Sequence, residues 1–510
     1  MKVGRNLLAG LANSVWSAFI TFAVVPVYLK YLGAESYGLV GFFVTAQALI
    51  VLLDLGLSST INRELARSTT TESLKDAAHL LHTLAVIYWA IALIIAIVVI
   101  GLSPLIANHW LQSKQLPANT VSHAVMLIGF VIACRWPIAL YQGALIGSQR
   151  LSMQSSINIV MVTLSHLGAV AVLVYLSPTI EAYFIWQAIV GIIYVITIRK
   201  VAWKVVGRPN SLVFSTSKLK QIWRFSVGMS AISVAGLVFM QLDKLILSRL
   251  ISLEDFGHYM LATVLVSSLY LLITPVYNVI YPKFSALVAS KDDLQLANVY
   301  LLGTRLLASI LFPLAMLLAV FSYNIVSIWT SNESVARDVA PLVSLLAIGS
   351  AIHGIMYFPY ALQLAYGKTS IPIKINAILI VLTVPITIYL TLQLGPLGGA
   401  LAWPILHICY FFIGVILTHK ELLSDVRWVW VKECVGIPLI ISILLGIFNY
   451  YFIAESLNFS IYIKLTLGVM VTLLAILLSV ITSSTLRKLH LNLFSLITFN
   501  RRETSHSRDS

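Results

Sequence analysis

The chain has 510 residues, of which 59% are hydrophobic and only 10% are charged, with a formal net charge of +14. Ordinary soluble domains carry about 25% charged residues, so this composition excludes a soluble globular protein. Apolar runs of about 20 residues, long enough to cross a hydrocarbon layer of ~30 Å, recur along the whole chain. They predict an all-α polytopic membrane protein.

The apolar runs predict about fourteen transmembrane helices. The first run follows a charged start and is longer than the core of a secretory signal, so we expect it to be a retained helix. The predicted spans lie at residues 7–29, 37–60, 82–106, 121–146, 155–176, 182–202, 223–248, 256–280, 304–329, 339–365, 372–394, 397–417, 435–454 and 461–483.

Lysine and arginine are distributed unevenly between the two sides of the membrane that this topology defines. Of the 33 basic side chains, 26 lie on one side and 5 on the other, while Arg135 and Lys244 lie within spans. Cytoplasmic loops are enriched in Lys and Arg, so we expect both termini in the cytoplasm. The positive net charge is therefore explained by the basic residues of the cytoplasmic loops. It does not indicate nucleic-acid binding, which would need a basic face on a soluble domain.

A polar, basic segment at residues 199–224, RKVAWKVVGRPNSLVFSTSKLKQIWR, divides six spans from the next six. Two spans follow the second set, and the chain ends in a basic tail. We therefore predict five parts: a six-helix bundle at 1–202, a cytoplasmic linker at 203–222, a second six-helix bundle at 223–417, two additional transmembrane helices at 418–484 and a cytoplasmic tail at 485–510.

A weak internal repeat relates the two predicted bundles. KYLGAESYG at 30–38 and RLISLEDFG at 249–257 align at a constant offset of 219 residues. The matching pairs are Lys30 with Arg249, Glu35 with Glu254, Tyr37 with Phe256 and Gly38 with Gly257. Both copies lie in the first outside turn of their half, which favours two parallel, pseudo-symmetric repeats related by an axis along the membrane normal. In transporters built this way the substrate site lies between the repeats.

The fourth span carries a full positive charge near its middle, in FVIACRWPIALYQG (130–143). A charge at the centre of a bilayer costs roughly 2.5–3.5 kcal/mol, so such residues tend to be functional. Gln142 lies seven residues after Arg135 and hence on the same helical face, and Pro137 between them predicts a kink. Two interpretations remain open: a buried ion pair that joins two helices, or a cationic contact for an anionic substrate in a wet cavity.

The seventh span has a polar stripe at helical spacing, made by Ser226, Ser230, Ser233, Gln241, Lys244 and Ser248. This stripe has to face protein or water, because a polar face toward lipid is costly. Asp243 and Lys244 either neutralise partners on neighbouring helices or take a functional role. In the functional interpretation, Lys244 is a second cation for phosphate and Asp243 is a proton or cation site.

Further polar residues suggest gating or substrate contacts. In the second span Asp54 lies on the same helical face as Gln47. Asp54 and Arg63 form either a structural ion pair at the membrane boundary or a pair that takes part in gating. Tyr277, in a run of tyrosines along the eighth span, is either a membrane-interface residue or a platform for a sugar. His353 is either packed and hydrogen-bonded, or a site of pH coupling, since imidazole titrates in the right range.

The sequence contains no catalytic or metal-binding constellation. Its three cysteines are Cys134, Cys409 and Cys434, which form no CxxC pair and have no matching histidines, so no metal site is indicated. A phosphate-binding GxxxxGK[ST] loop and an HExxH motif are also missing from the sequence. We expect a protein that is not an enzyme, uses no cofactor and is driven by an ion or substrate gradient.

Two blocks of sequence resemble a known family. VVPVYLKYLGAESYGLVGFFVTAQALIVLLDLGLSSTINRELAR (24–67) is similar to the first two helices of Wzx-type polysaccharide flippases. QLDKLILSRLISLEDFGHYMLATVLV (241–266), followed by TPVYNVIYPKFSALVAS (274–290), looks like their seventh and eighth helices. These flippases share a superfamily with the MATE multidrug exporters and the lipid II flippases.

The resemblance implies two six-helix bundles of MATE-like fold around a central cavity, with two peripheral helices added. It also implies a multi-pass protein of a bacterial inner membrane that moves an undecaprenyl-diphosphate-linked oligosaccharide, such as an O-antigen repeat unit, to the periplasmic leaflet by alternating access. An O-antigen polymerase and a chain-length regulator are the protein partners that follow from it. Chemistry assigns the diphosphate to Arg135 and Lys244, since arginine binds phosphate through two parallel hydrogen bonds. We place Gln142, Gln241 and Tyr277 in the same substrate site.

Two related functions remain as alternatives. A lipid II flippase would carry an arginine-rich first helix, whereas here no cation lies between Arg5 and Lys30. A MATE-type ion-coupled exporter would use acidic cavity residues, for which Asp54 and Asp243 are candidates. An O-antigen polymerase or ligase would need a long periplasmic loop, and the longest outside loop, near 107–121, is only some fifteen residues.

Overall fold

The structure is a computed structural model that describes residues 2–68, 70–207, 214, 236–456 and 459–482. The predicted cytoplasmic tail, most of the predicted linker and the serines at 226, 230 and 233 lie outside these residues. Within the described residues every regular element is a helix, and the one β-bridge, between Gln112 and Ser252, is isolated. The predicted all-α fold is confirmed.

The helices follow one another with short connections. The first set is α1 (Lys2–Ile50), η1 (Val51–Asp54), α2 (Leu57–Arg67), α3 (Thr71–Leu105), η2 (Ile106–Trp110), α4 (Ala118–Arg135), α5 (Ile138–Gly147), α6 (Leu151–Tyr175) and α7 (Ile180–Val206). After the helical residues 236–250 come α9 (Leu253–Val266), η3 (Ser267–Leu269), α10 (Tyr270–Ala289), α11 (Asp293–Val320), α12 (Ser322–Thr330), α13 (Glu333–Ile355), α14 (Tyr357–Ala365), α15 (Ser370–Leu394), α16 (Pro396–Glu421), η4 (Ser424–Val426), α17 (Arg427–Val429), η5 (Trp430–Gly436), α18 (Ile437–Asn449), η6 (Tyr450–Ala454) and α19 (Ile461–Ile481).

Twelve helical stretches of the described chain are long and apolar enough to cross a membrane. One of them, Leu8–Asp54, covers two predicted spans, and the helical residues 236–250 belong to a further predicted span that is only partly described. The number of crossings therefore agrees with the predicted count of about fourteen.

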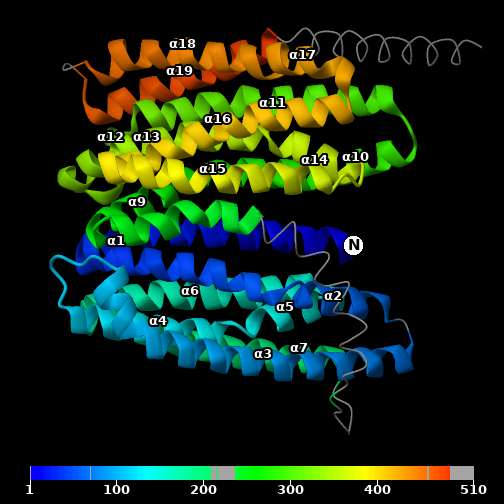
Figure 1. The fold of residues 1–510 in the computed structure, drawn as a ribbon, viewed down its shortest axis with the longest axis vertical. Helices are drawn as coiled ribbons and strands as arrows, with labels where there is room; N and C mark the ends of the chain where they lie inside the picture. Colours follow the sequence, from blue (N-terminus) through cyan, green and yellow to red (C-terminus); the bar gives the residue numbers. More distant parts are fainter. Residues whose placement is uncertain (1, 69, 208–213, 215–235, 457–458, 483–510) are drawn as a thin grey trace, which may run out of the picture. The chain divides into compact units, whose positions relative to one another are not determined.

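The chain reverses direction inside α1. As a straight helix its 49 residues would measure about 74 Å, far more than a bilayer core of ~30 Å. Gly33 interrupts the helical conformation with φ 78° and ψ 169°, a region that glycine adopts without steric cost. Figure 1 shows α1 running from the N-terminus to this point and returning toward α2.

Two further breaks interrupt helices of the first set, one between α4 and α5 and one between η1 and α2. The kink predicted from Pro137 is confirmed, because α4 ends at Arg135 and α5 begins at Ile138. The second predicted span, 37–60, is wrong as a single helix, since Leu55 and Gly56 have left-handed conformations with φ of 46° and 75°. The chain thereby turns from η1 into α2 directly after Asp54.

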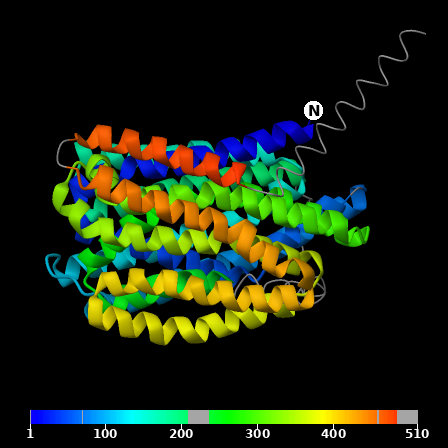
Figure 2. The same cartoon turned by 90° about the horizontal axis from the view of Figure 1, so that it is seen from above.

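The helices group by their contacts into two compact units. The first contains residues 1–264 and 383–399, and the second contains 265–382 and 400–510. In the first unit, α1 packs on α6, α4 packs between α3 and α7, and α2 packs on α5. In the second unit, α11 packs on α13, α18 and α19, and α18 and α19 lie side by side in both views (Figure 1, Figure 2). The five-part division predicted from the sequence stays a prediction.

Arg305 has a different place from the one that the sequence suggested. The topology count treats it as one of the basic residues of the inner loops, whereas its side chain is only 1% exposed within α11. Its guanidinium donates to the carbonyl oxygens of Glu433 and Ser479, the latter at 2.6 Å, and to Thr482 Oγ1 at 3.0 Å. One arginine thus joins α11 to η5 and to the end of α19.

Replacing Arg305 by alanine is expected to lower the thermal stability of the purified protein. Hydrogen bonds to charged groups contribute roughly 1.5–3 kcal/mol each when their partners are otherwise unsatisfied. The unfolding temperature in detergent should therefore fall by several degrees, while Lys374→Ala, which removes an exposed cation from α15, should leave it unchanged. Equal unfolding temperatures for the two variants would show that Arg305 does not hold the additional helices.

Candidate functional site

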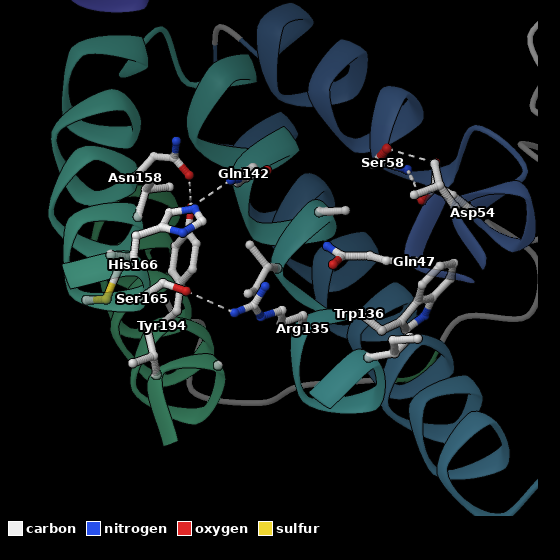
Figure 3. Close-up of a pocket in the computed structure, with 18 residues that line it drawn as sticks. Gln47, Asp54, Ser58, Arg135, Trp136, Gln142, Asn158, Ser165, His166 and Tyr194 are labelled. Atoms are coloured by element: carbon white, nitrogen blue, oxygen red, sulfur yellow. Dashed lines mark hydrogen bonds between the residues drawn. The ribbon is translucent and has the colours of Figure 1, made fainter. Parts of the chain in front are cut away.

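The first unit contains a polar cavity of about 370 Å³. Its walls come from α1, η1 and α2 on one side and from α4, α5, α6 and α7 on the other (Figure 3). The polar side chains that line it are Gln47, Asp54, Ser58, Arg135, Gln142, Asn158, Ser165, His166 and Tyr194. Hydrogen-bonding side chains are thus concentrated at one place among helices whose sequences are mostly apolar.

Arg135 lies at the break between α4 and α5 and extends into this polar cavity (Figure 3). Its Nη2 donates to Gln187 Oε1 at 2.5 Å and to Ser165 Oγ at 3.3 Å, and its guanidinium carbon lies 5.5 Å from the ring centre of Phe43. Among the residues that the structure describes, no carboxylate forms an ion pair with Arg135. The partners of this charge within the described chain are therefore neutral side chains, and its role as a substrate contact stays a prediction.

A second polar layer lies toward the α5 end of the cavity. Gln142 Nε2 donates to the Tyr194 hydroxyl at 2.8 Å, and that hydroxyl donates to Asn158 Oδ1 at 2.8 Å. The Asn158 amide in turn donates to Asn13 Oδ1 at 2.7 Å. These side chains are joined in a fixed network, so this layer shapes the cavity and leaves Arg135 as its cationic group.

Asp54 brings a carboxylate to the same cavity. Figure 3 shows Gln47 between Arg135 and the pair formed by Asp54 and Ser58. Ser58 Oγ donates to Asp54 Oδ2 at 2.8 Å, and the Tyr88 hydroxyl donates to Oδ1. Arg63, the partner expected from the sequence, instead pairs with Glu64 at 2.7 Å.

Lys244 and Asp243 form an ion pair with each other. Lys244 Nζ lies 3.1 Å from Asp243 Oδ1 and donates to the Met240 carbonyl at 3.0 Å. The buried Asp243 carboxylate also accepts from the Tyr259 hydroxyl at 2.6 Å. Neither residue lines the polar cavity, and neither does Gln241. The structure therefore separates these three from the Arg135 group.

Tyr277 and His353 belong to an aromatic cluster in the second unit. The Tyr277 ring stacks on Tyr281 at 5.9 Å and on Tyr360 at 6.1 Å. His353 Nδ1 is hydrogen-bonded to the Tyr270 hydroxyl at 2.8 Å. The tyrosines of α10 and the histidine of α13 are therefore in contact. Their positions in the sequence did not predict this contact.

Sequence reasoning missed several cavity residues, yet a periodic signal marks most of them. Four stretches of chain each contribute a polar pair seven residues apart, which is two helical turns or about 10 Å. The pairs are Gln47 with Asp54, Arg135 with Gln142, Asn158 with Ser165 and Gln187 with Tyr194. All of these residues line the cavity except Gln187, which accepts a hydrogen bond from Arg135. Only the first two pairs entered the sequence-based prediction.

The two copies of the internal repeat meet within the first unit. A Cβ atom on Gly38 would overlap the carbonyl oxygen of Leu253, and a Cβ on Gly257 would overlap that of Ala34. Each of these two contacts becomes the other when the repeat offset of 219 residues is applied to both partners. We refer to residues 34–41 and 253–260 together as the glycine crossing.

The loop after η2 contacts both segments of the glycine crossing. The Glu35 carboxylate accepts from the backbone amides of Gln115 and Leu116 at 2.9 and 3.1 Å. From the same loop, the Gln112 carbonyl accepts from the Leu253 amide at 2.8 Å. One loop therefore joins the two copies of the repeat through backbone groups and a single carboxylate.

Comparison with known proteins agrees with this architecture. A family model described as "Polysaccharide biosynthesis protein" matches residues 3–288, and no curated protein matches the sequence. The lipid II flippase MurJ in an inward closed conformation superposes with a TM-score of 0.73 at 15% identity, covering 92% of this chain and 97% of MurJ. An inward-facing multidrug MATE transporter gives 0.64 at 14% identity, covering 81% and 95%.

A transporter of the same MOP superfamily from Pyrococcus furiosus superposes with a TM-score of 0.56 at 14% identity, covering 82% of this chain and 96% of that one. These identities are low, so the superpositions establish the fold and leave the substrate open. The family model matches more than half of the sequence. The chain is a multi-pass membrane protein that belongs to the polysaccharide biosynthesis protein family and has the fold of the MOP-superfamily flippases and transporters.

Proposed function

We propose that the protein is a Wzx-type flippase, which moves an undecaprenyl-diphosphate-linked oligosaccharide from the cytoplasmic to the periplasmic leaflet. The observation that carries the proposal is Arg135, a cation with neutral partners in a polar cavity of a chain from a polysaccharide biosynthesis family. A diphosphate cannot cross hydrocarbon unaided, because an ionised group has to leave water at a large cost. A cavity that offers a guanidinium lowers this cost.

The geometry suggests how Arg135 binds the diphosphate. Its hydrogen bonds to Gln187 and Ser165 both start from Nη2, so Nε and Nη1 make none to the described residues. Arginine uses its nitrogens in parallel to hold phosphate oxygens. A cavity of about 370 Å³ is near the lower end of the sizes of ligand sites. The diphosphate therefore occupies it in this proposal, and most of the oligosaccharide remains outside.

Alternating access needs an end of the molecule that closes and opens. The glycine crossing is closed here, and its backbones are in direct contact because residues 38 and 257 have no side chain. In the proposal it separates when the substrate is released on the periplasmic side. Small residues allow such close helix contacts in membranes, where packing rather than the hydrophobic effect drives association.

The other residues singled out by the sequence take supporting roles in the proposal. Asp54, Arg63, the Asp243–Lys244 pair and His353 are candidates for ion coupling or gating. Lys244 adds to the diphosphate site only if its pairing with Asp243 is released. The stacked rings of Tyr277 and its neighbours offer a platform for a sugar. The bacterial inner membrane, cytoplasmic termini, and a polymerase and chain-length regulator as partners also belong to this proposal.

Purified protein in liposomes tests the proposed function directly. The liposomes would contain a fluorescent undecaprenyl-diphosphate oligosaccharide, and a membrane-impermeant quencher would report how much of it reaches the outer leaflet. We expect translocation of this lipid and little translocation of lipid II. Preferential movement of lipid II, to whose flippase the fold is similar, would replace the proposal with that alternative.

A MATE-type exporter is the second candidate, and the Asp54 carboxylate in the polar cavity is the observation in its favour. An exporter of cations would expel a cationic dye from the same liposomes when a sodium or proton gradient is imposed. It would need Asp54 and would tolerate the loss of Arg135. Dye export with this pattern, and no movement of the lipid-linked oligosaccharide, would contradict the flippase proposal.

A further inference from the structure

A second, larger pocket of about 670 Å³ lies on the first unit, away from the polar cavity. One wall is α3, with His82, Ala85, Val86 and Trp89, and the other wall is α7, with Ile196, Arg199, Lys200 and Trp203. Tyr141 of α5 is buried between them. In Figure 1, α3 and α7 run along the edge of the first unit that is farthest from α9. We refer to this pocket as the α3–α7 groove.

The sequence builds each wall as one helical face. On α3 the lining residues follow the spacing i, i+3, i+4, i+7, and on α7 Ile196, Arg199, Lys200 and Trp203 follow a similar spacing. The floor exists because the chain breaks at Pro137, which ends α4 and lets the short helix α5 lie between α3 and α7.

The groove changes in character along its length. Arg199 and Lys200, both exposed, lie in the last turns of α7, at the boundary that the distribution of basic residues assigns to the cytoplasmic side. Trp89 lies seven residues beyond His82 on α3, about 10 Å deeper in the membrane. Val86, Trp89 and Ile196 are 45%, 38% and 46% exposed, so the deeper part offers apolar and aromatic surface to lipid.

The charges of the groove are of one sign. Among the residues described, no carboxylate lines it, while two basic side chains, Arg199 and Lys200, lie on one wall. Basic pockets between transmembrane helices on the cytoplasmic side bind anionic lipid head groups. We propose that the α3–α7 groove is a binding site for an anionic glycerophospholipid of the surrounding membrane. The phosphate lies at Arg199 and Lys200, and an acyl chain lies along Val86, Trp89 and Ile196.

Native mass spectrometry of the full-length protein tests this proposal with phosphatidylglycerol and with phosphatidylcholine. Wild-type protein is expected to retain phosphatidylglycerol in preference to the zwitterionic lipid. Changing both Arg199→Gln and Lys200→Gln should weaken phosphatidylglycerol binding by about tenfold or more, since each cation near a membrane surface contributes about 1 kcal/mol. The matched control is Lys75→Gln with Lys204→Gln, which removes two exposed cations outside the groove.

A second variant covers the case in which loss of two cations impairs insertion. Val86→Trp keeps every charge and fills the apolar part of the groove, so it should also weaken phosphatidylglycerol binding. Equal binding by wild type and by both groove variants would overturn the proposal. So would displacement of phosphatidylglycerol by equimolar undecaprenyl diphosphate in wild type, because the groove would then be an entry site for the transported lipid.

Discussion

Arg135→Ala is expected to reduce export of the surface polysaccharide by roughly 10- to 100-fold, because a hydrogen bond to a charged group contributes about 1.5–3 kcal/mol. The substitution removes the one cation that lines the polar cavity among the described residues. Arg135→Lys should restore part of the export, since lysine supplies the charge without the two parallel donors of a guanidinium. The measurement is surface polysaccharide in a bacterial strain that lacks its own flippase, at matched levels of membrane-inserted protein.

The control for this experiment is Arg337→Ala, which removes an exposed arginine of α13 that does not line the cavity. It should export as the wild type does. If Arg135→Ala inserts normally and exports normally, the charge is dispensable and the diphosphate site is wrong. If Arg135→Ala does not accumulate in the membrane, the arginine serves mainly to hold Gln187 and Ser165, and its role is structural.

Gly38→Ala and Gly257→Ala are each expected to reduce export by about tenfold or more, although each adds a single methyl group. In this structure the new Cβ would overlap a backbone carbonyl, which cannot move aside as a flexible side chain can. Because interiors are close-packed, the two segments would have to separate. The glycine crossing would then stay partly open, and the cavity could not be closed toward the periplasm.

Accessibility of Ser36, a buried residue within the crossing, distinguishes this effect from a general loss of stability. The experiment uses a protein in which the three native cysteines are replaced and Ser36→Cys is introduced. A membrane-impermeant maleimide added from outside should label the cysteine at position 36 several times faster when Gly38→Ala or Gly257→Ala is also present than when neither is. Gly101→Ala is the matched control, because a Cβ at Gly101 would meet nothing within 4 Å. Labelling and export equal to those of this control would show that the crossing is not a gate.

The sequence by itself determined the fold class and the approximate positions of the spans. In a bilayer every backbone polar group has to be satisfied within its own helix, so length and hydropathy of each segment decide the outcome locally. The same reasoning identified Arg135, since a charge in an apolar run stands out without any structure. It also identified the break at Pro137, because a proline in a helix interior lacks the N–H for a backbone hydrogen bond, although other prolines, such as Pro313 of α11, lie within continuous helices.

Only the tertiary structure decided which polar side chains meet. Adjacent residues on a helix point in different directions, so the pairing of Lys244 with Asp243 could not be expected from spacing. Arg305 looked like a loop cation and is instead surrounded by the carbonyl groups of η5 and α19. Partners of this kind depend on how each helix is rotated about its axis, and packing against neighbouring helices sets that rotation. Hydropathy carries no information about rotation when the residues on every face of a helix are apolar.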